Sequence, residues 1–83
     1  MILELSVPNK VVGAKQVKRA LQDGRAEKLF LARDADPRVT EPLAAQAGQA
    51  GVPVEEVSTM KELGSACGIA VGSAVAAIVV PRP

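Results

Sequence analysis

Four short apolar runs alternate with three stretches of helical periodicity along these 83 residues. The apolar runs lie at 10–13, 28–33, 52–57 and 74–80, and the helical patterns between them lie at 14–23, 40–50 and 59–68. Strands that alternate with helices need crossover connections, which produce a largely parallel or mixed sheet with helices on both faces. The alternation therefore predicts an α/β fold, a three-layer α/β/α sandwich around a four-stranded, mostly parallel or mixed sheet.

Local signals set the expected limits of several elements. Thr40 is the candidate cap of the second helix, and Pro42 is tolerated in its first turn. Thr59 and Glu62, three residues apart, match a capping box at the start of the third helix. Pro53 predicts that the third strand lies at an edge of the sheet or begins just after the proline.

The core must be aliphatic, because Phe30 is the only aromatic residue. Apolar residues make up 48% of the chain, too many for a disordered protein, and we expect residues 1–83 to form a single domain. RNA-recognition sheets and oligonucleotide-binding barrels stack bases on several aromatic side chains, so neither is expected here. Any bound nucleic acid would be held by polar edges, backbone amides and aliphatic contacts.

The cysteine and histidine content restricts the chemistry further. Cys67 is the only cysteine and there is no histidine, so neither an intrachain disulfide nor a zinc cluster is expected. Residues 1–5 lack the features of a signal peptide, and the longest apolar run, 74–80, is far too short to span a membrane. We therefore expect a cytoplasmic protein with no cofactor, no metal site and no membrane association.

A run near the start of the chain, 11–19, is the first candidate site. Two valines lead into Gly13, and the helix that follows carries Lys15, Gln16 and Arg19 on one side. The free N–H groups and partial positive charge of a helix N-terminus suit phosphate. Amide and basic side chains match guanine edges or phosphate oxygens. The cluster indicates a nucleic-acid site, and the alternative is a merely solvated helix face.

The distribution of charge agrees with an anionic partner. Residues 1–40 hold eight Lys or Arg and five Asp or Glu, whereas residues 41–83 hold two and four. The net charge of +1 is therefore the sum of a basic first half and an acidic second half. A basic half is a mild indication that the partner is anionic.

The glycine-flanked loop before the last strand is the second candidate site. Ile69 and Val71 lie there between Gly68 and Gly72, although loop residues are usually polar. One interpretation is that both side chains tuck under the loop and cap the core. The other is an exposed apolar lip that packs on a partner, for example an unstacked base.

Four segments, in the same order along the chain, resemble the kink-turn RNA-binding ribosomal protein family, the L-seven-Ae and L-thirty-e superfamily. The resemblance is closest to its small bacterial, YbxF-like members. The segments are GAKQVKR at 13–19, LARDADP at 31–37, VPV at 52–54 and LGSACGIAVG at 63–72. The resemblance implies an α/β/α sandwich that grips a sharply bent RNA at tandem sheared G·A pairs.

The resemblance also implies roles for the residues of the first candidate site. The family residues that match Lys15 and Gln16 reach the guanines, the one that matches Arg19 adds a basic contact, and Gly13 allows close approach of the backbone. Archaeal relatives carry Asn-Glu in place of Lys15-Gln16, and bacterial relatives share the Lys-Gln form. The implied partner is a kink-turn, in ribosomal RNA or another non-coding RNA, bound by a monomer.

In the second candidate site the resemblance implies contact with a displaced nucleotide. The loop residues that match Ile69, Ala70 and Val71 cover a flipped-out base. Ala70 stands where the family often has an acidic residue, so a polar contact is lost there. Lys61, at another helix start, is expected to add a peripheral phosphate contact.

Two other classes of function remain open on the sequence. The Ile69–Val71 loop could be the dry patch of a protein-interaction module without RNA affinity. A small phosphoryl-transfer enzyme would use Asp34, Asp36 and Lys61 with a magnesium ion, and a thiol enzyme would use Cys67. The chain is too short for a five-stranded receiver domain, however, and it offers no histidine as a base. We therefore expect a non-catalytic protein that binds and stabilises bent RNA.

Overall fold

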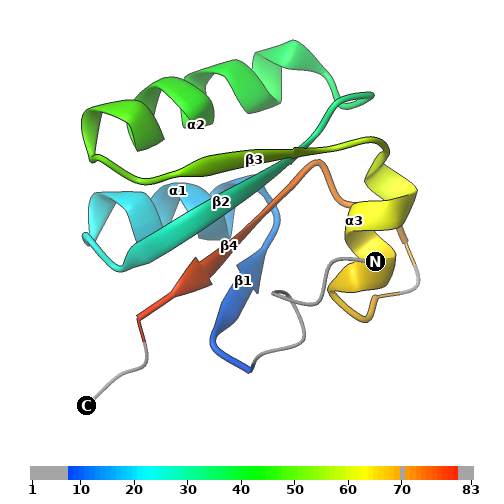
Figure 1. The fold of residues 1–83 in the computed structure, drawn as a ribbon, viewed down its shortest axis with the longest axis horizontal. Helices are drawn as coiled ribbons and strands as arrows, with labels where there is room; N and C mark the ends of the chain where they lie inside the picture. The colour runs from blue at the N-terminus through cyan, green and yellow to red at the C-terminus, as the bar shows by residue number, and fades with distance from the viewer. Residues whose placement is uncertain (1–7, 70, 81–83) are drawn as a thin grey trace.

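The computed structural model describes residues 8–69 and 71–80, which form four strands and three helices in alternation (Figure 1). In chain order these are β1 (Lys10–Val12), α1 (Ala14–Gln22), β2 (Ala26–Ala32), α2 (Pro37–Gln49), β3 (Val54–Val57), α3 (Met60–Ala66) and β4 (Val75–Val79). The predicted order of elements is confirmed. None of the helices in the described ranges is long and apolar enough to cross a bilayer.

The four strands form one sheet in the order β1-β4-β2-β3. β4 is antiparallel to both of its neighbours, whereas β2 and β3 are parallel. The mixed form of the predicted sheet is confirmed, and a mostly parallel one is not, because the last strand inserts between the first two. The Ala32 N–H donates to the Ala74 carbonyl (2.9 Å), so β4 begins where β2 ends. β3 is an edge strand that starts directly after Pro53, as the proline predicts.

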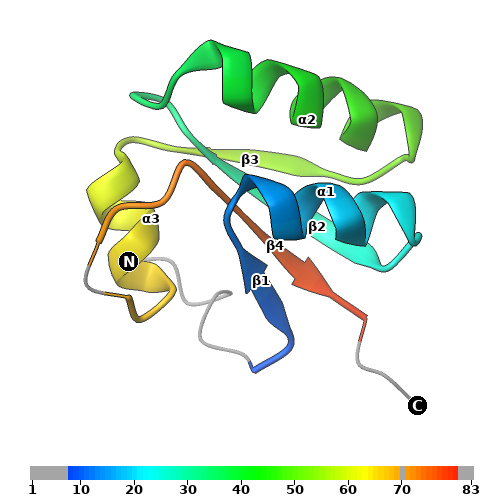
Figure 2. The ribbon, with the colours of Figure 1, turned by 180° about the vertical axis from the view of Figure 1, so that it is seen from behind.

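Helices cover both faces of this sheet, which confirms the three-layer arrangement (Figures 1 and 2). Alternate residues of β2 point to opposite faces, as in any strand. Leu29 and Leu31 pack in the cluster that includes Leu43 of α2, whereas Phe30 packs in the cluster that includes Leu63 of α3. One strand therefore serves both halves of the core, with α1 and α2 on one face and α3 on the other.

The start of α2 differs from the prediction. The helix begins at Pro37 rather than after Thr40, because the carboxylate of Asp36 caps it by accepting the Arg38 N–H (2.9 Å). Asp is a strong N-cap residue, and proline suits the first helical position, where its missing N–H costs nothing. The sequence 34–37, predicted to be a loop, thus contains the true helix cap.

Two caps hold the N-terminus of α3. The Thr59 hydroxyl accepts the Glu62 N–H (3.0 Å), so the threonine caps the helix as the capping-box pattern predicts. The carboxylate of Asp34 accepts the Met60 N–H (2.7 Å). This second bond joins the turn after β2 to the first residue of α3.

Candidate nucleic-acid interface

β1 passes into α1 through a turn that favours glycine. Gly13 has φ 101° and ψ 150°, a conformation that strains any residue with a Cβ. Its N–H donates to the Val75 carbonyl (3.0 Å), and its own carbonyl accepts the Val17 N–H (3.0 Å), which is the first bond of α1. The N–H groups of residues 14–16 precede that bond and have no helical acceptor. The first turn of α1 also has no acidic side chain, so its N–H donors remain open to an anion.

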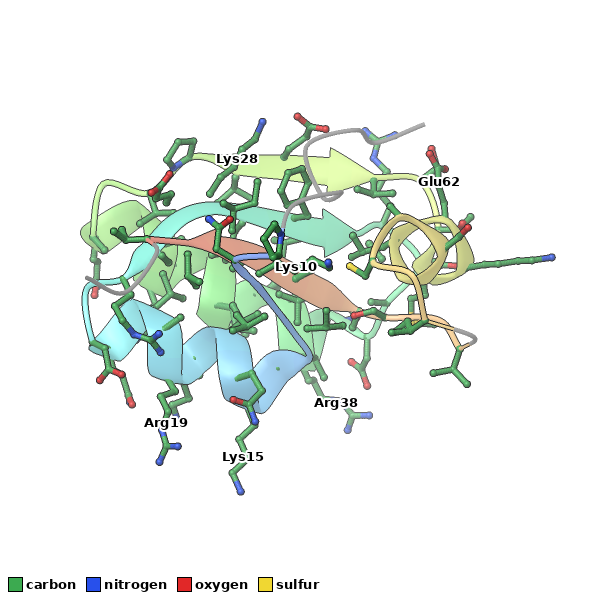
Figure 3. The ribbon with its side chains drawn as sticks, turned by 90° about the horizontal axis from the view of Figure 1, so that it is seen from below. Lys10, Lys15, Arg19, Lys28, Arg38 and Glu62 are labelled. Atoms are coloured by element: carbon green, nitrogen blue, oxygen red, sulfur yellow. The ribbon has the colours of Figure 1, made fainter. Side chains whose placement is uncertain are left out.

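The polar residues predicted at this helix start come together on one surface. Val17 is fully buried against the sheet, whereas the polar side chains around it are exposed. One shallow depression on α1 is lined by Lys15, Gln16, Lys18, Arg19 and Gln22. Figure 3 shows Lys15 and Arg19 pointing away from the sheet on the same side of the molecule. We call this surface the α1 depression.

The second candidate site lies next to the first. The α3–β4 loop leads directly into β4, and the first residue of that strand, Val75, accepts the Gly13 N–H. Segments that are far apart in the sequence, the start of α1 and the α3–β4 loop, therefore meet at one end of the sheet (Figure 2).

Glycine ends α3 in the manner that its position in the sequence predicts. Gly68 has φ 78°, its N–H donates to the Ser65 carbonyl (3.0 Å), and the Ile69 N–H donates to the Gly64 carbonyl (3.1 Å). This pair of bonds is a Schellman motif, which needs a left-handed residue and so favours glycine. The loop thus leaves the helix in a defined direction.

Two other glycines seat the loop on the helix. A Cβ on Gly64 would collide with the Val71 carbonyl oxygen, and a Cβ on Gly72 would lie 3.1 Å from the Met60 Cβ. The Ser73 N–H donates to the Met60 carbonyl (3.0 Å). The loop backbone therefore rests directly on α3. The sequence analysis did not predict this contact between the loop and α3. A glycine inside a helix, at a cost of about 1 kcal/mol relative to Ala, was the signal for this contact.

The loop presents its apolar side chains outward. Val71 is 72% exposed and Ile69 is 37% exposed, so the interpretation that they tuck under the loop is wrong for Val71 and fails to bury Ile69. Ala70, the third predicted loop residue, lies outside the described residues. Lys61 is exposed on α3, beyond the sheet from α1, and does not line the α1 depression.

The sequence analysis missed a basic groove beside the α1 depression. The groove runs between α1 and α2 and is lined by Lys15, Lys18 and Arg38, with Val39, Pro42 and Leu43 among its other residues. Figure 3 shows Arg38 projecting to the same side as Lys15. Only the packing of α1 against α2 brings these side chains together, so no local spacing in the sequence could have indicated the groove.

The residues considered for catalysis have structural roles. Asp34 and Asp36 each cap a helix, and the side-chain hydrogen bonds from Arg38 hold the pKa of the Asp36 carboxyl below its usual value. Cys67 is only 7% exposed, and burial raises the pKa of its thiol, which disfavours the nucleophilic thiolate. Across residues 8–69 and 71–80, no three potential ligands gather into a metal site.

Comparison with known proteins agrees with this architecture. The model of the ribosomal protein L7Ae/L30e/S12e/Gadd45 family matches residues 4–82. An RNA-binding protein of Geobacillus sp. (strain WCH70) is 45% identical over 75 residues, covering 90% of this chain and 92% of that protein. The RNA-binding protein YbxF of Geobacillus stearothermophilus is 48% identical over 68 residues, covering 82% of this chain and 83% of the relative.

More distant relatives share the fold. The large ribosomal subunit protein eL8 of Halobacterium salinarum is 38% identical over 68 residues, and the match covers 81% of this chain and 57% of eL8. The solved structure of a Giardia lamblia 15.5kD RNA-binding protein superimposes with a TM-score of 0.84 at 29% identity, covering 94% of this chain and 66% of that protein. The resemblance seen in the sequence is thereby confirmed. The chain belongs to the ribosomal protein L7Ae/L30e/S12e/Gadd45 family.

Proposed function

We propose that this protein binds RNA through the start of α1 and the α3–β4 loop, and that its targets are kink-turns with tandem sheared G·A pairs. The observation that carries the proposal is the hydrogen bond from the Gly13 N–H to the Val75 carbonyl, which brings the start of α1 to the end of the α3–β4 loop. These two segments carry exposed surfaces of different chemistry, the polar α1 depression and the apolar Val71 side chain.

The chemistry of α1 favours guanine edges in an opened groove. Guanine presents the O6 and N7 acceptors that a lysine matches, and the Gln16 amide can both donate and accept. A regular RNA duplex hides these edges in a deep, narrow major groove that side chains cannot read. A helix start that carries Lys15, Gln16 and Arg19 therefore fits RNA whose groove is opened by a bend better than it fits a plain duplex.

The loop chemistry favours an unstacked nucleotide. A base that leaves the stack exposes an apolar face, and with no exposed aromatic residue in the chain, an aliphatic side chain must cover it. Val71 offers such a side chain, and the backbone on either side of it packs on α3 at Gly64 and Gly72. Because these contacts exist without RNA, less conformational entropy is lost when the base docks.

The relatives support the same proposal. Bacterial proteins that align over most of this chain are named RNA-binding proteins, and a more distant relative is a protein of the large ribosomal subunit. We therefore assign the chain as one monomeric RNA-binding domain, with a kink-turn of ribosomal or other non-coding RNA as the partner.

The test is a titration with two RNAs that differ only at the G·A pairs. One carries a kink-turn, and in the other the G·A pairs are replaced by Watson–Crick pairs. We expect at least a tenfold preference for the kink-turn, because each well-placed base contact discriminates by about 1–3 kcal/mol. Fluorescence transfer between the two stems should rise as the protein selects the bent form. Equal affinity for the two RNAs would contradict the proposal and favour the protein-interaction alternative, in which Val71 packs on a protein.

A further inference from the structure

Basic side chains line the groove between α1 and α2 together with apolar residues such as Val39 and Pro42. Its charged lining residues are Lys15, Lys18 and Arg38, and none of the described residues that line it is acidic. The Arg38 side chain is 90% exposed, and Lys18 is exposed as well. A concave surface whose charged side chains are all cations concentrates positive potential and attracts anions.

The guanidinium of Arg38 is held in place at the mouth of this groove. Its Nε and Nη2 donate to the carboxylate of Asp36, at 3.1 Å and 2.8 Å, and the same carboxylate caps α2. The side chain is therefore oriented before any ligand arrives, while Nη1 takes no part in these bonds and can donate to an anion. A planar guanidinium suits the oxygens of a phosphate.

The groove is continuous with the α1 depression. Lys15 and Lys18 line both hollows, so an anion bound in one lies beside the other. A third hollow, at the carboxyl ends of β2 and β3, provides a contrast. It contains Arg33 but also Glu41 and Glu56, so its charge does not favour phosphate.

We propose that the α1–α2 groove binds the phosphate backbone of an RNA stem that flanks the G·A site, with Lys18 and Arg38 as phosphate ligands. This inference rests on the proposed function and extends it from the bend to the adjoining stem. A phosphate backbone fits the groove better than a protein helix does. The large apolar side chains with the greatest exposure in the described ranges are Val54, Ile69, Val71 and Val80, and none of them lines the groove.

The test compares two RNAs with the same kink-turn. The first has stems cut to the shortest length that keeps the bend, and the second has stems lengthened by a full helical turn. The variant Arg38→Ala should bind the short RNA like the wild type, because Arg38 lines the groove and not the α1 depression. On the long RNA we expect its affinity to fall several-fold and its salt dependence to weaken by about 0.7–0.9 in the log–log slope, the change expected for one lost phosphate contact.

Arg33→Ala is the matched control, because Arg33 is also an exposed arginine paired with a neighbouring carboxylate, that of Glu56 (2.7 Å). It should leave both affinities unchanged. If the melting temperature of Arg38→Ala falls, Arg38→Gln carries the same test, since it keeps an N–H donor for Asp36 and removes only the charge. Unchanged affinity and slope on the long RNA would overturn the inference and favour a protein partner in the groove. An equal loss on both RNAs would also overturn it, by placing Arg38 in the G·A site.

The proposed function is tested separately in the same series. It fails if the wild type does not distinguish the short kink-turn RNA from its Watson–Crick counterpart. The groove is tested by the difference between long and short RNAs, so the two failures have different signatures.

Discussion

The start of α1 and the α3–β4 loop lie side by side and are both exposed, yet they are built in opposite ways. In α1 the buried Val17 packs the helix against the sheet, and the exposed polar side chains are not part of the core. In the loop the backbone itself is packed, through Gly64 and Gly72, and only side chains such as Val71 project. Binding and stability should therefore be separable at the exposed side chains of α1 and at Val71, and coupled at the glycines on which the loop backbone packs.

The largest effect expected from this comparison is on stability, from Gly64→Ala. The added Cβ would collide with the Val71 carbonyl oxygen, a backbone atom that cannot avoid the contact by a rotamer change as a side chain could. Overpacking typically costs 1–3 kcal/mol, and a collision with backbone belongs at the upper end, so we expect about 3 kcal/mol less free energy of unfolding. RNA affinity should fall as well, because the loop must move. Urea unfolding measures the first effect, and an RNA titration measures the second.

Gly48→Ala is the matched control for this prediction. Gly48 also lies inside a helix, α2, but a Cβ there would meet nothing within 4 Å. Alanine is the better helix former, so this variant should gain about 0.5–1 kcal/mol of stability. Equal behaviour of the two variants would show that the loop is not seated on α3 through Gly64.

The next largest effect is on binding, from Val71→Asp. At 72% exposure the new carboxylate costs little stability, but it removes an apolar contact and repels phosphate. We expect a loss of roughly 2 kcal/mol in RNA binding with an unchanged melting temperature. Val54→Asp adds the same charge on β3, the edge strand farthest from β1, where Val54 is 40% exposed, and should bind normally. A folded Val71→Asp variant with full affinity would remove the loop from the site.

The separability of the α1 site is tested by Gln16→Ala and Arg19→Ala. Both side chains are exposed, so neither change should move the melting temperature. Each should weaken binding by about 1–2 kcal/mol, as expected when a base-edge or charge-assisted hydrogen bond is lost. Gln49→Ala, at the far end of α2, is the control and should bind like the wild type. A large fall in melting temperature for Gln16→Ala would show that this side chain contributes to stability, so that binding and stability are not separable in α1.

The sequence predicted those features of the fold that depend on local pattern. Alternating apolar runs and helical periodicity predicted the order of the elements, and Thr59 and Gly68 marked the ends of α3. The insertion of β4 between β1 and β2 was not predictable in the same way, because strand order depends on contacts between distant residues. The start of α2 was misplaced for a local reason, since Asp36 is a stronger cap than Thr40.

The same distinction between local pattern and distant contacts applies to the candidate site. Lys15, Gln16 and Arg19 share one helix turn, so their spacing alone predicted that they would lie together. The contact of Gly64 with the loop and the placing of Arg38 beside Lys18 arise from packing between elements. Neither could be read from spacing, and both affect how much RNA surface the protein can reach.

The smallest expected effect is that of Lys61→Ala, which tests where the binding surface ends. Lys61 is exposed on α3, on the other side of the sheet from α1, and lies outside the α1 depression. A cation at that distance from the G·A site can reach at most one phosphate, so the slope of log affinity against log salt should weaken by less than about 0.9. The affinity at moderate salt should fall only a few-fold, and the preference for the kink-turn over its Watson–Crick counterpart should not change, because a phosphate contact carries no sequence information. Measuring the affinity of the variant for both RNAs across a salt series tests this directly. If the loss is as large as that of Arg19→Ala, or if discrimination is lost, the prediction is wrong. The surface of α3 around Lys61 then belongs to the RNA-binding site, as the α3–β4 loop does.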